Sequence, residues 1–262
     1  MTQAHTNTRA RTPRLAKLKA ALRSLRRDQR AVAMIEAAIT MPTLIFAALA
    51  GLEIANLMIT HTRVSSVALS VADNASRIAS GSNLALPQVR ETDVNDVFTG
   101  AQLQAGNLNM LANGRIIVSS LEVNATGGQW VHWQRCYGNK PYGSRYGAQG
   151  TGATGTGYPG MGPSGREVKA ASGAPVMFVE IYYDYTPFIY ASFIGNKRIE
   201  YTAAFTVRDA RDTSNIFNPA PAAVVNSCGT NPAPPPDDDG NNGGGNDDDG
   251  YDETNPGGGG GP

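Results

Sequence analysis

One carboxylate lies where the sequence is otherwise apolar. It is Glu36, within the stretch RRDQRAVAMIEAAITMP at 26–42. An ionised acid inside a membrane helix costs free energy and normally marks a function or a paired partner. The competing interpretation is that Glu36 reaches back to the polar interface, because it lies close to the end of the apolar run.

The apolar run that holds Glu36 predicts a transmembrane helix over 31–60. Ala31 to Thr60 contain no Lys or Arg, and a helix needs ~20 apolar residues to cross a bilayer. A secretory signal peptide has the same basic-then-apolar order, but its apolar region is only about 7–15 residues long and ends at a small-x-small cleavage site.

Charge predicts the orientation of this helix. Residues 1–30 form a basic leader with nine Lys/Arg against the single acid Asp28, whereas no Lys or Arg follows Arg211. The positive-inside rule then keeps the N-terminus in the cytoplasm. We therefore expect an inner-membrane protein whose C-terminal domain is periplasmic or extracellular.

The helical pattern continues beyond the apolar run. Apolar residues recur at three- and four-residue steps over 61–82, which predicts an amphipathic continuation of the same helix. Unbroken from 31 to 79, it would be ~73 Å long. Pro42 can bend or loosen it. Its polar residues fall on two stripes, Glu36 with Thr40 and Thr43, and Glu53 with Asn56 and Thr60; for Glu53 we favour simple contact with the outer membrane interface.

Residues 83–228 are predicted to form an α+β head. A helix is expected over 91–114, and β-branched and aromatic residues predict four strands, at 115–124, 130–137, 176–188 and 198–209. Between the second and third strands, 138–165 is so rich in Gly that we expect a long mobile loop. The tail, 229–262, is Gly-, Pro- and Asp-rich and is expected to be disordered. Its two DDDG clusters do not have the spacing of an EF-hand loop.

The two cysteines, Cys136 and Cys228, lie far apart and form no CxxC or Cys/His metal spacing. In an oxidising compartment such a pair favours a structural disulfide. Two unpaired core cysteines are the alternative. If the bridge forms, it would hold the otherwise loose segment 210–228 against the sheet.

Motifs for catalysis are missing from the sequence. His5, His61 and His132 are isolated, and there is no GxSxG, HExxH, P-loop or dinucleotide fingerprint. We therefore expect no enzymatic activity, no metal site and no cofactor, and we expect no nucleic-acid partner.

The N-terminal stretch RAVAMIEAAITMP, with GLEIAN and VADNASRIAS after it, resembles the TadE-like family, pseudopilins of the tight-adherence (Flp) pilus machinery. The resemblance covers about 26–80 and rests on the basic leader, the Glu offset and the Pro offset. The family commonly has Gly where this chain has Ala31, and an aromatic residue where it has Ala37.

This resemblance implies a pilin-like fold and a role for four residues. A prepilin peptidase would cut after Ala31, so that Val32 becomes the mature N-terminus. The ammonium of Val32 would pair with Glu36 of a neighbouring subunit, and Pro42 completes the motif. We expect a minor pilin or assembly factor, with the membrane and other pilus-assembly proteins or pilin subunits as partners. The alternative is an uncleaved single-pass protein with an extracytoplasmic binding head.

Overall fold

A computed structural model describes residues 19, 23–24, 29–78, 86–188 and 197–229 of the chain. Most of the predicted basic leader, the end of the predicted helical continuation at 79–82 and the predicted disordered tail from 230 onward lie outside these residues. The chain divides into two compact units, Met1–Leu52 and Glu53–Pro262. We call the second unit the head.

The first element is one long helix, α2, which runs from Gln29 to Arg77 with Pro42 inside it. The prediction of a single long apolar helix is therefore confirmed. Its residues are good or neutral helix formers apart from Pro42 and Gly51, and no Gly/Pro cluster interrupts it. Pro42 leaves the carbonyl of Ala38 without its backbone donor but does not end the helix.

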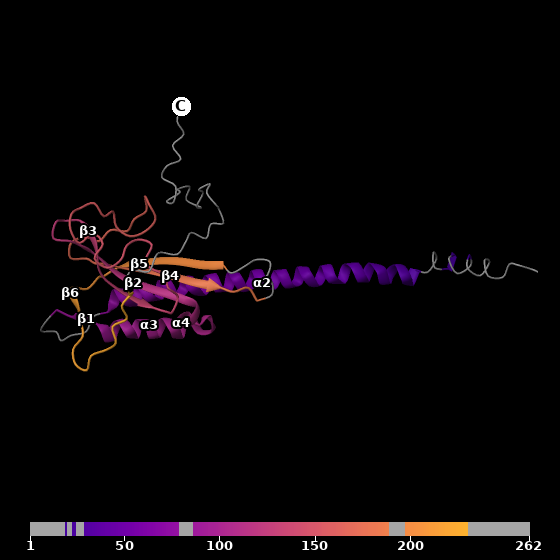
Figure 1. The fold of residues 1–262 in the computed structure, drawn as a ribbon, viewed down its shortest axis with the longest axis horizontal. Helices are drawn as coiled ribbons and strands as arrows, with labels where there is room; N and C mark the ends of the chain where they lie inside the picture. Colours follow the sequence, from indigo (N-terminus) through magenta and orange to yellow (C-terminus); the bar gives the residue numbers. More distant parts are fainter. Residues whose placement is uncertain (1–18, 20–22, 25–28, 79–85, 189–196, 230–262) are drawn as a thin grey trace, which may run out of the picture. The chain divides into compact units, whose positions relative to one another are not determined.

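The head is an α+β structure built on a four-stranded antiparallel sheet (Figure 1). The strand order is β3-β2-β4-β5, so that β2 and β4 are central. Each of the four predicted strands is present, with bounds shifted by a few residues: β2 is Gly114–Val123, β3 is Gln129–Tyr137, β4 is Val176–Tyr185 and β5 is Lys197–Thr206.

Helices cover one face of this sheet. The helix α3 spans Glu91–Ala105, and the predicted helix over 91–114 ends early because Gly106 and Asn109 have positive φ. A short 3₁₀ turn, Gly106–Leu108, and the helix α4, Met110–Asn113, follow. The buried stripe of α2 packs here with α3 and with alternate sheet residues, among them Val64, Val67, Val71, Phe98, Ile116, Val118, Val179 and Ile181.

The Gly-rich segment covers the opposite face. Instead of a mobile loop, 138–175 is a layer of turns whose Tyr146, Tyr158 and Met161 pack on Phe178 of β4. The glycines permit this close packing: a Cβ on Gly152, where φ is +75°, would lie 2.3 Å from the carbonyl oxygen of Gln129. The sheet is thus buried on both sides.

A buried ion pair joins the helical layer to the sheet. Glu91 opens α3, where a negative charge is favoured by the helix dipole. The Nε of Arg135 on β3 lies 3.0 Å from both carboxylate oxygens of Glu91, and Glu91 is buried. Breaking such a pair from one side is strongly destabilising because it leaves an unpaired charge.

The C-terminal end of α2 is held by a residue far along the chain. Arg211 is buried and donates to the carbonyl oxygens of Ser76 and Ile78. A cation at this end also complements the helix dipole. Burial lowers the pKa of Arg211. Next to it, β1 (Gln88–Arg90) and β6 (Asp212–Phe217) form a parallel pair that the sequence pattern does not predict.

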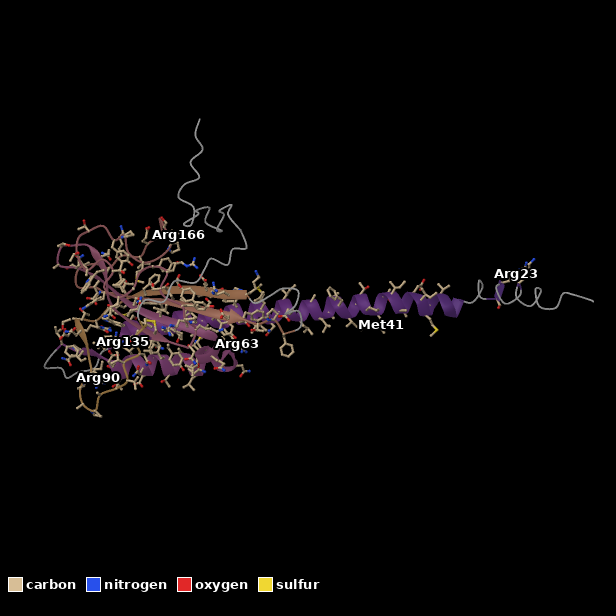
Figure 2. The ribbon with its side chains drawn as sticks, in the orientation of Figure 1. Arg23, Met41, Arg63, Arg90, Arg135 and Arg166 are labelled. Carbon is tan, nitrogen blue, oxygen red and sulfur yellow. A yellow bond between two sulfur atoms is a disulfide. The ribbon has the colours of Figure 1, made fainter. Side chains whose placement is uncertain are left out.

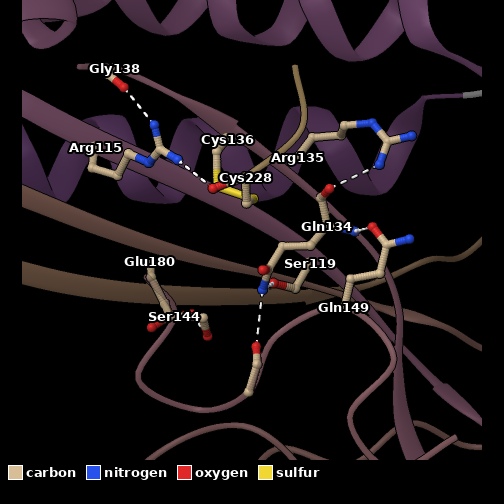
Figure 3. The surroundings of a disulfide bond; sticks show 11 residues. Arg115, Ser119, Gln134, Arg135, Cys136, Gly138, Ser144, Gln149, Glu180 and Cys228 are labelled. Carbon is tan, nitrogen blue, oxygen red and sulfur yellow. Dashed lines mark hydrogen bonds between the residues drawn. A yellow bond between two sulfur atoms is a disulfide. The ribbon is translucent and has the colours of Figure 1, made fainter. Parts of the chain in front are cut away.

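The predicted disulfide is present between Cys136 and Cys228, which are 92 residues apart in sequence. It holds the segment after β6 on the edge of β3, where the amide of Cys136 also donates to the carbonyl of Asn226 at 2.8 Å. Figure 3 shows Arg115 beside the bridge, donating to the carbonyl oxygens of Cys228 and Gly138 at 3.1 and 2.6 Å.

We expect Cys136→Ser and Cys228→Ser to destabilise the head equally, each by about 2–4 kcal/mol, because either one reopens a long loop in the unfolded chain. Chemical denaturation of the full chain in detergent would measure this. The double variant serves as control and should lose no more than either single variant. Two free thiols in non-reduced protein would contradict the pairing.

Candidate functional site

The segment of α2 from Val32 to Leu52 exposes nearly all of its apolar side chains. Apart from Leu49, which is partly buried, every large apolar side chain in this range is more than half exposed, from Val32 at 54% to Met34 at 75%. Figure 2 labels Met41 on this exposed segment. At ~1.5 Å per residue the segment is roughly 31 Å long, close to the ~30 Å hydrocarbon core of a bilayer.

Among the described residues, α2 is the one helix long and apolar enough to cross a membrane. The core helix of a soluble protein can be equally apolar, but such a helix is buried, whereas the most apolar part of α2 is not. An exposed apolar surface of this size is favourable only against lipid or another apolar partner.

Glu36 is the single ionisable residue between Val32 and Leu52. Its side chain is exposed, and it makes no hydrogen bond or ion pair with any other residue that the structure describes. Thr43, on the same predicted stripe, donates to the carbonyl oxygen of Ile39 at 3.0 Å and so is satisfied within its own helix. Glu36 is therefore the charged group of this segment that is available to a partner.

The other predicted processing and assembly residues also lie on α2. Ala31 and Val32 are helical, because α2 begins at Gln29, and Pro42 lies within the helix. Val32 is exposed. Ala31, Val32, Glu36 and Pro42 thus share one element, and the disulfide Cys136–Cys228 belongs to the head and forms no common site with them.

The interpretation of Glu53 as an interface residue is wrong. Its side chain is 3% exposed and lies inside the head. The hydroxyl of Tyr185 donates to its Oε1 at 2.5 Å, and the amide of Phe188 donates to its two oxygens at 3.1 and 3.0 Å. Burial and the hydrogen bond to Glu53 raise the pKa of Tyr185 to about 12, which keeps its hydroxyl a donor at neutral pH.

The rest of the second polar stripe also faces the head. Asn56 donates to the hydroxyl of Tyr185 at 2.9 Å, and the buried Thr60 donates to the carbonyl oxygen of Asn56. Packing of α2 on the head therefore starts at Glu53, earlier than the boundary at 60 that hydropathy suggests. The missed signal was the spacing: Glu53 and Thr60 stand in register with the buried Val64, Val67 and Val71.

A third buried acid, Glu180, lies on β4 beneath the Gly-rich segment. It accepts hydrogen bonds from the hydroxyl of Ser144 at 2.5 Å, the amide of Arg145 at 2.9 Å and the hydroxyl of Tyr182 at 2.8 Å. Burial nevertheless raises the pKa of its carboxyl, and this outweighs the three donors. A cavity of about 150 Å³ opens beside it, also lined by Arg145 and Glu200.

One constellation in the head has the residue types of a hydrolase triad. The Nδ1 of His132 lies 3.0 Å from Glu122, and the ring stacks on Trp130. Ser120, however, donates to the same Glu122 oxygen, at 2.7 Å, instead of to the histidine, and it is fully buried. In a triad the serine is hydrogen-bonded to the histidine; here both side chains bond to Glu122, so Ser120 and His132 do not form the nucleophile–base pair of a triad.

Among the residues that the structure describes, no three His, Cys, Asp or Glu side chains converge as metal ligands would. No family model, no curated protein and no solved structure matches this chain.

Replacement of Glu53 should separate its role from that of Glu36. Glu53→Ala leaves the Tyr185 hydroxyl and the Phe188 amide without their acceptor, and we expect a loss of about 1–3 kcal/mol of head stability. Glu36→Ala, on the same helix, should change head stability by less than about 0.5 kcal/mol. Near-UV circular dichroism of the full chain in detergent would follow the unfolding. Equal effects of the two variants would contradict the assignment.

Glu180 should make the head less stable as pH rises. An unfolded Glu titrates near ~4.3, and the folded pKa is raised, so the folded state binds more protons between these two values. The stabilisation is complete below pH ~4.3 and is lost as pH rises through the folded pKa.

Unfolding free energies of Glu180→Gln and the unaltered chain, measured across this range, should therefore diverge, with the variant lacking the decline. The exposed Asp96→Asn on α3 is the matched control and should keep the decline. A decline that persists in Glu180→Gln would show that another group causes it.

Proposed function

We propose that the chain is a membrane-anchored pseudopilin of the TadE-like type, acting as a minor pilin or assembly factor of a tight-adherence pilus. The observation that carries the proposal is Glu36, a lone, exposed and unpartnered carboxylate, among the described residues, on an apolar helical segment. A charge in that setting is costly and is kept where it meets a partner.

The partner that this chemistry favours is a new N-terminus. If the leader is removed after Ala31, the ammonium of Val32 carries a positive charge at the head of the apolar segment. Attraction between an ammonium and a carboxylate is weak in water and becomes large where water is scarce. A bilayer or a bundle of packed helices is such a place, so Glu36 of one subunit and Val32 of the next would select the register of helix packing.

The disulfide supports the proposed topology. Bridges such as Cys136–Cys228 persist in oxidising compartments and are rare in the cytosol. Together with the basic residues before α2, this favours a cytoplasmic N-terminus and a head outside the inner membrane. Packing of α2 on the head from Glu53 onward would then leave Val32–Leu52 as the part that crosses the bilayer.

One observation favours the alternative, an uncleaved single-pass protein with a binding head. The Ala31–Val32 peptide bond lies inside α2, which begins at Gln29. A peptidase that binds its substrate as an extended strand would have to unwind this first turn. Helix ends fray readily, so the free-energy cost of unwinding this turn is small. The two functions therefore differ in whether the peptide bond is cut.

The mature N-terminus decides between them. We expect terminal sequencing of protein purified from its host membranes to begin at Val32. Glu36→Ala should still insert, because removing the charge lowers the insertion cost by roughly 2.5–3.5 kcal/mol, but piliation should be lost. Thr40→Ala, on the same helix face, is the matched control and should leave pili in sheared surface fractions unchanged.

A bulky residue at Ala31 should block cutting and leave the precursor. An intact leader on the membrane-purified protein would contradict the pseudopilin proposal and favour the uncleaved anchor. Normal pili in the Glu36→Ala strain would show that the carboxylate is not needed for assembly and would contradict its proposed role.

A further inference from the structure

Phe188 is the most exposed large apolar side chain of the described residues, at 88%. It follows β4, and its position is fixed by its own backbone, because its amide donates to both oxygens of Glu53. Glu53 is the residue of α2 directly after the exposed apolar segment Val32–Leu52. The backbone of Phe188 is therefore held beside the first residue that follows the candidate membrane span.

Exposed apolar and basic side chains also occur on α2 close to Glu53 and at the start of β5. Ile54 and Met58, on the turns of α2 next to Glu53, are also more than half exposed. Lys197, the first residue of β5, is exposed and pairs in register with Tyr185. A Lys at the end of an apolar span is typical of the residues that anchor membrane proteins at the headgroup level, and Phe is among the apolar residues that interfacial segments bury at that depth.

We propose that Phe188 inserts into the headgroup–acyl boundary of the bilayer that holds α2, as a second membrane contact of the head. Burying such a ring is favourable because it removes apolar surface from water, and no described part of the chain covers it. The contact limits rotation of the head about the helix axis. This inference rests on the membrane anchoring in the proposed function.

The bilayer is favoured over a second copy of the chain as the occupant. A lipid surface lies beside Glu53 as soon as Val32–Leu52 spans the membrane, and Phe188 is tied to that same residue. Lys197 would at the same time face the lipid phosphates, which attract an ammonium at the interface. A protein partner would have to supply an apolar surface at this level as well as a counter-charge.

Depth-dependent quenching tests the inference. The full chain is reconstituted in phosphatidylcholine vesicles with bromine on the acyl chains, either near the headgroup or near the chain end. Three single-tryptophan additions are compared with the unaltered chain, whose Trp130 and Trp133 set the background. They are Phe188→Trp, Phe46→Trp in the apolar segment, and Leu103→Trp, a head residue that is 78% exposed.

Leu103 is a matched control because it is nearly as exposed but lies elsewhere on the head. Its neighbour Gln104 donates to Ser66 at 3.2 Å, and Ser66 is about 20 Å along α2 from Glu53 at ~1.5 Å per residue. We expect Phe188→Trp to shift its emission to the blue and lose most of it to shallow bromines. Phe46→Trp should respond mainly to deep bromines, and Leu103→Trp to neither.

Each result has one meaning. If Phe46→Trp is quenched but Phe188→Trp is quenched no more than Leu103→Trp, the second membrane contact is overturned and the membrane anchor remains. No quenching at Phe46 overturns the anchoring and the inference with it. A blue shift of Phe188→Trp without quenching, growing with the protein-to-lipid ratio, places the ring against a second copy and also overturns the inference.

Discussion

The hydrogen bonds of Glu53 determine where the long helix changes its surroundings. Before this residue α2 exposes its apolar side chains, and after it one stripe of the same helix is buried in the head. A carboxylate buried at that point requires donors, because an unsatisfied charge away from water is costly. Tyr185 and the amide of Phe188 supply them, and both come from the end of β4. The sheet is therefore fixed to the helix at the first residue of the head.

Buried acids with their own hydrogen-bond donors also hold the layers of the head together. Each face of the sheet has a buried acid with its own donors: Glu91 with Arg135 on the helical side, and Glu180 with Ser144 and Tyr182 on the side of the Gly-rich segment. Such groups add little net stability, since desolvation offsets most of the attraction. They do penalise any other arrangement of the layers, in which the same charge would be buried without its donors.

Two acids on one helix thus have opposite roles. Glu53 is satisfied inside its own chain, whereas Glu36 is exposed on an apolar surface and has no partner among the described residues. Side-chain chemistry is the same in both, so the difference comes from the surroundings. Glu53 contributes to folding, and Glu36 is the acid that our proposal assigns to assembly.

Elements with a local signal can be predicted from the amino-acid sequence. The length of α2, the four strands of the antiparallel sheet and the existence of the disulfide follow from hydropathy, from β-branched and aromatic runs and from compartment chemistry. The burial of Glu53, the packing of the Gly-rich segment on the sheet and the capping of α2 by Arg211 become visible in the folded chain alone. These depend on residues more than a hundred positions apart, or on glycine conformations that composition does not specify, and hydropathy read along the chain carries neither.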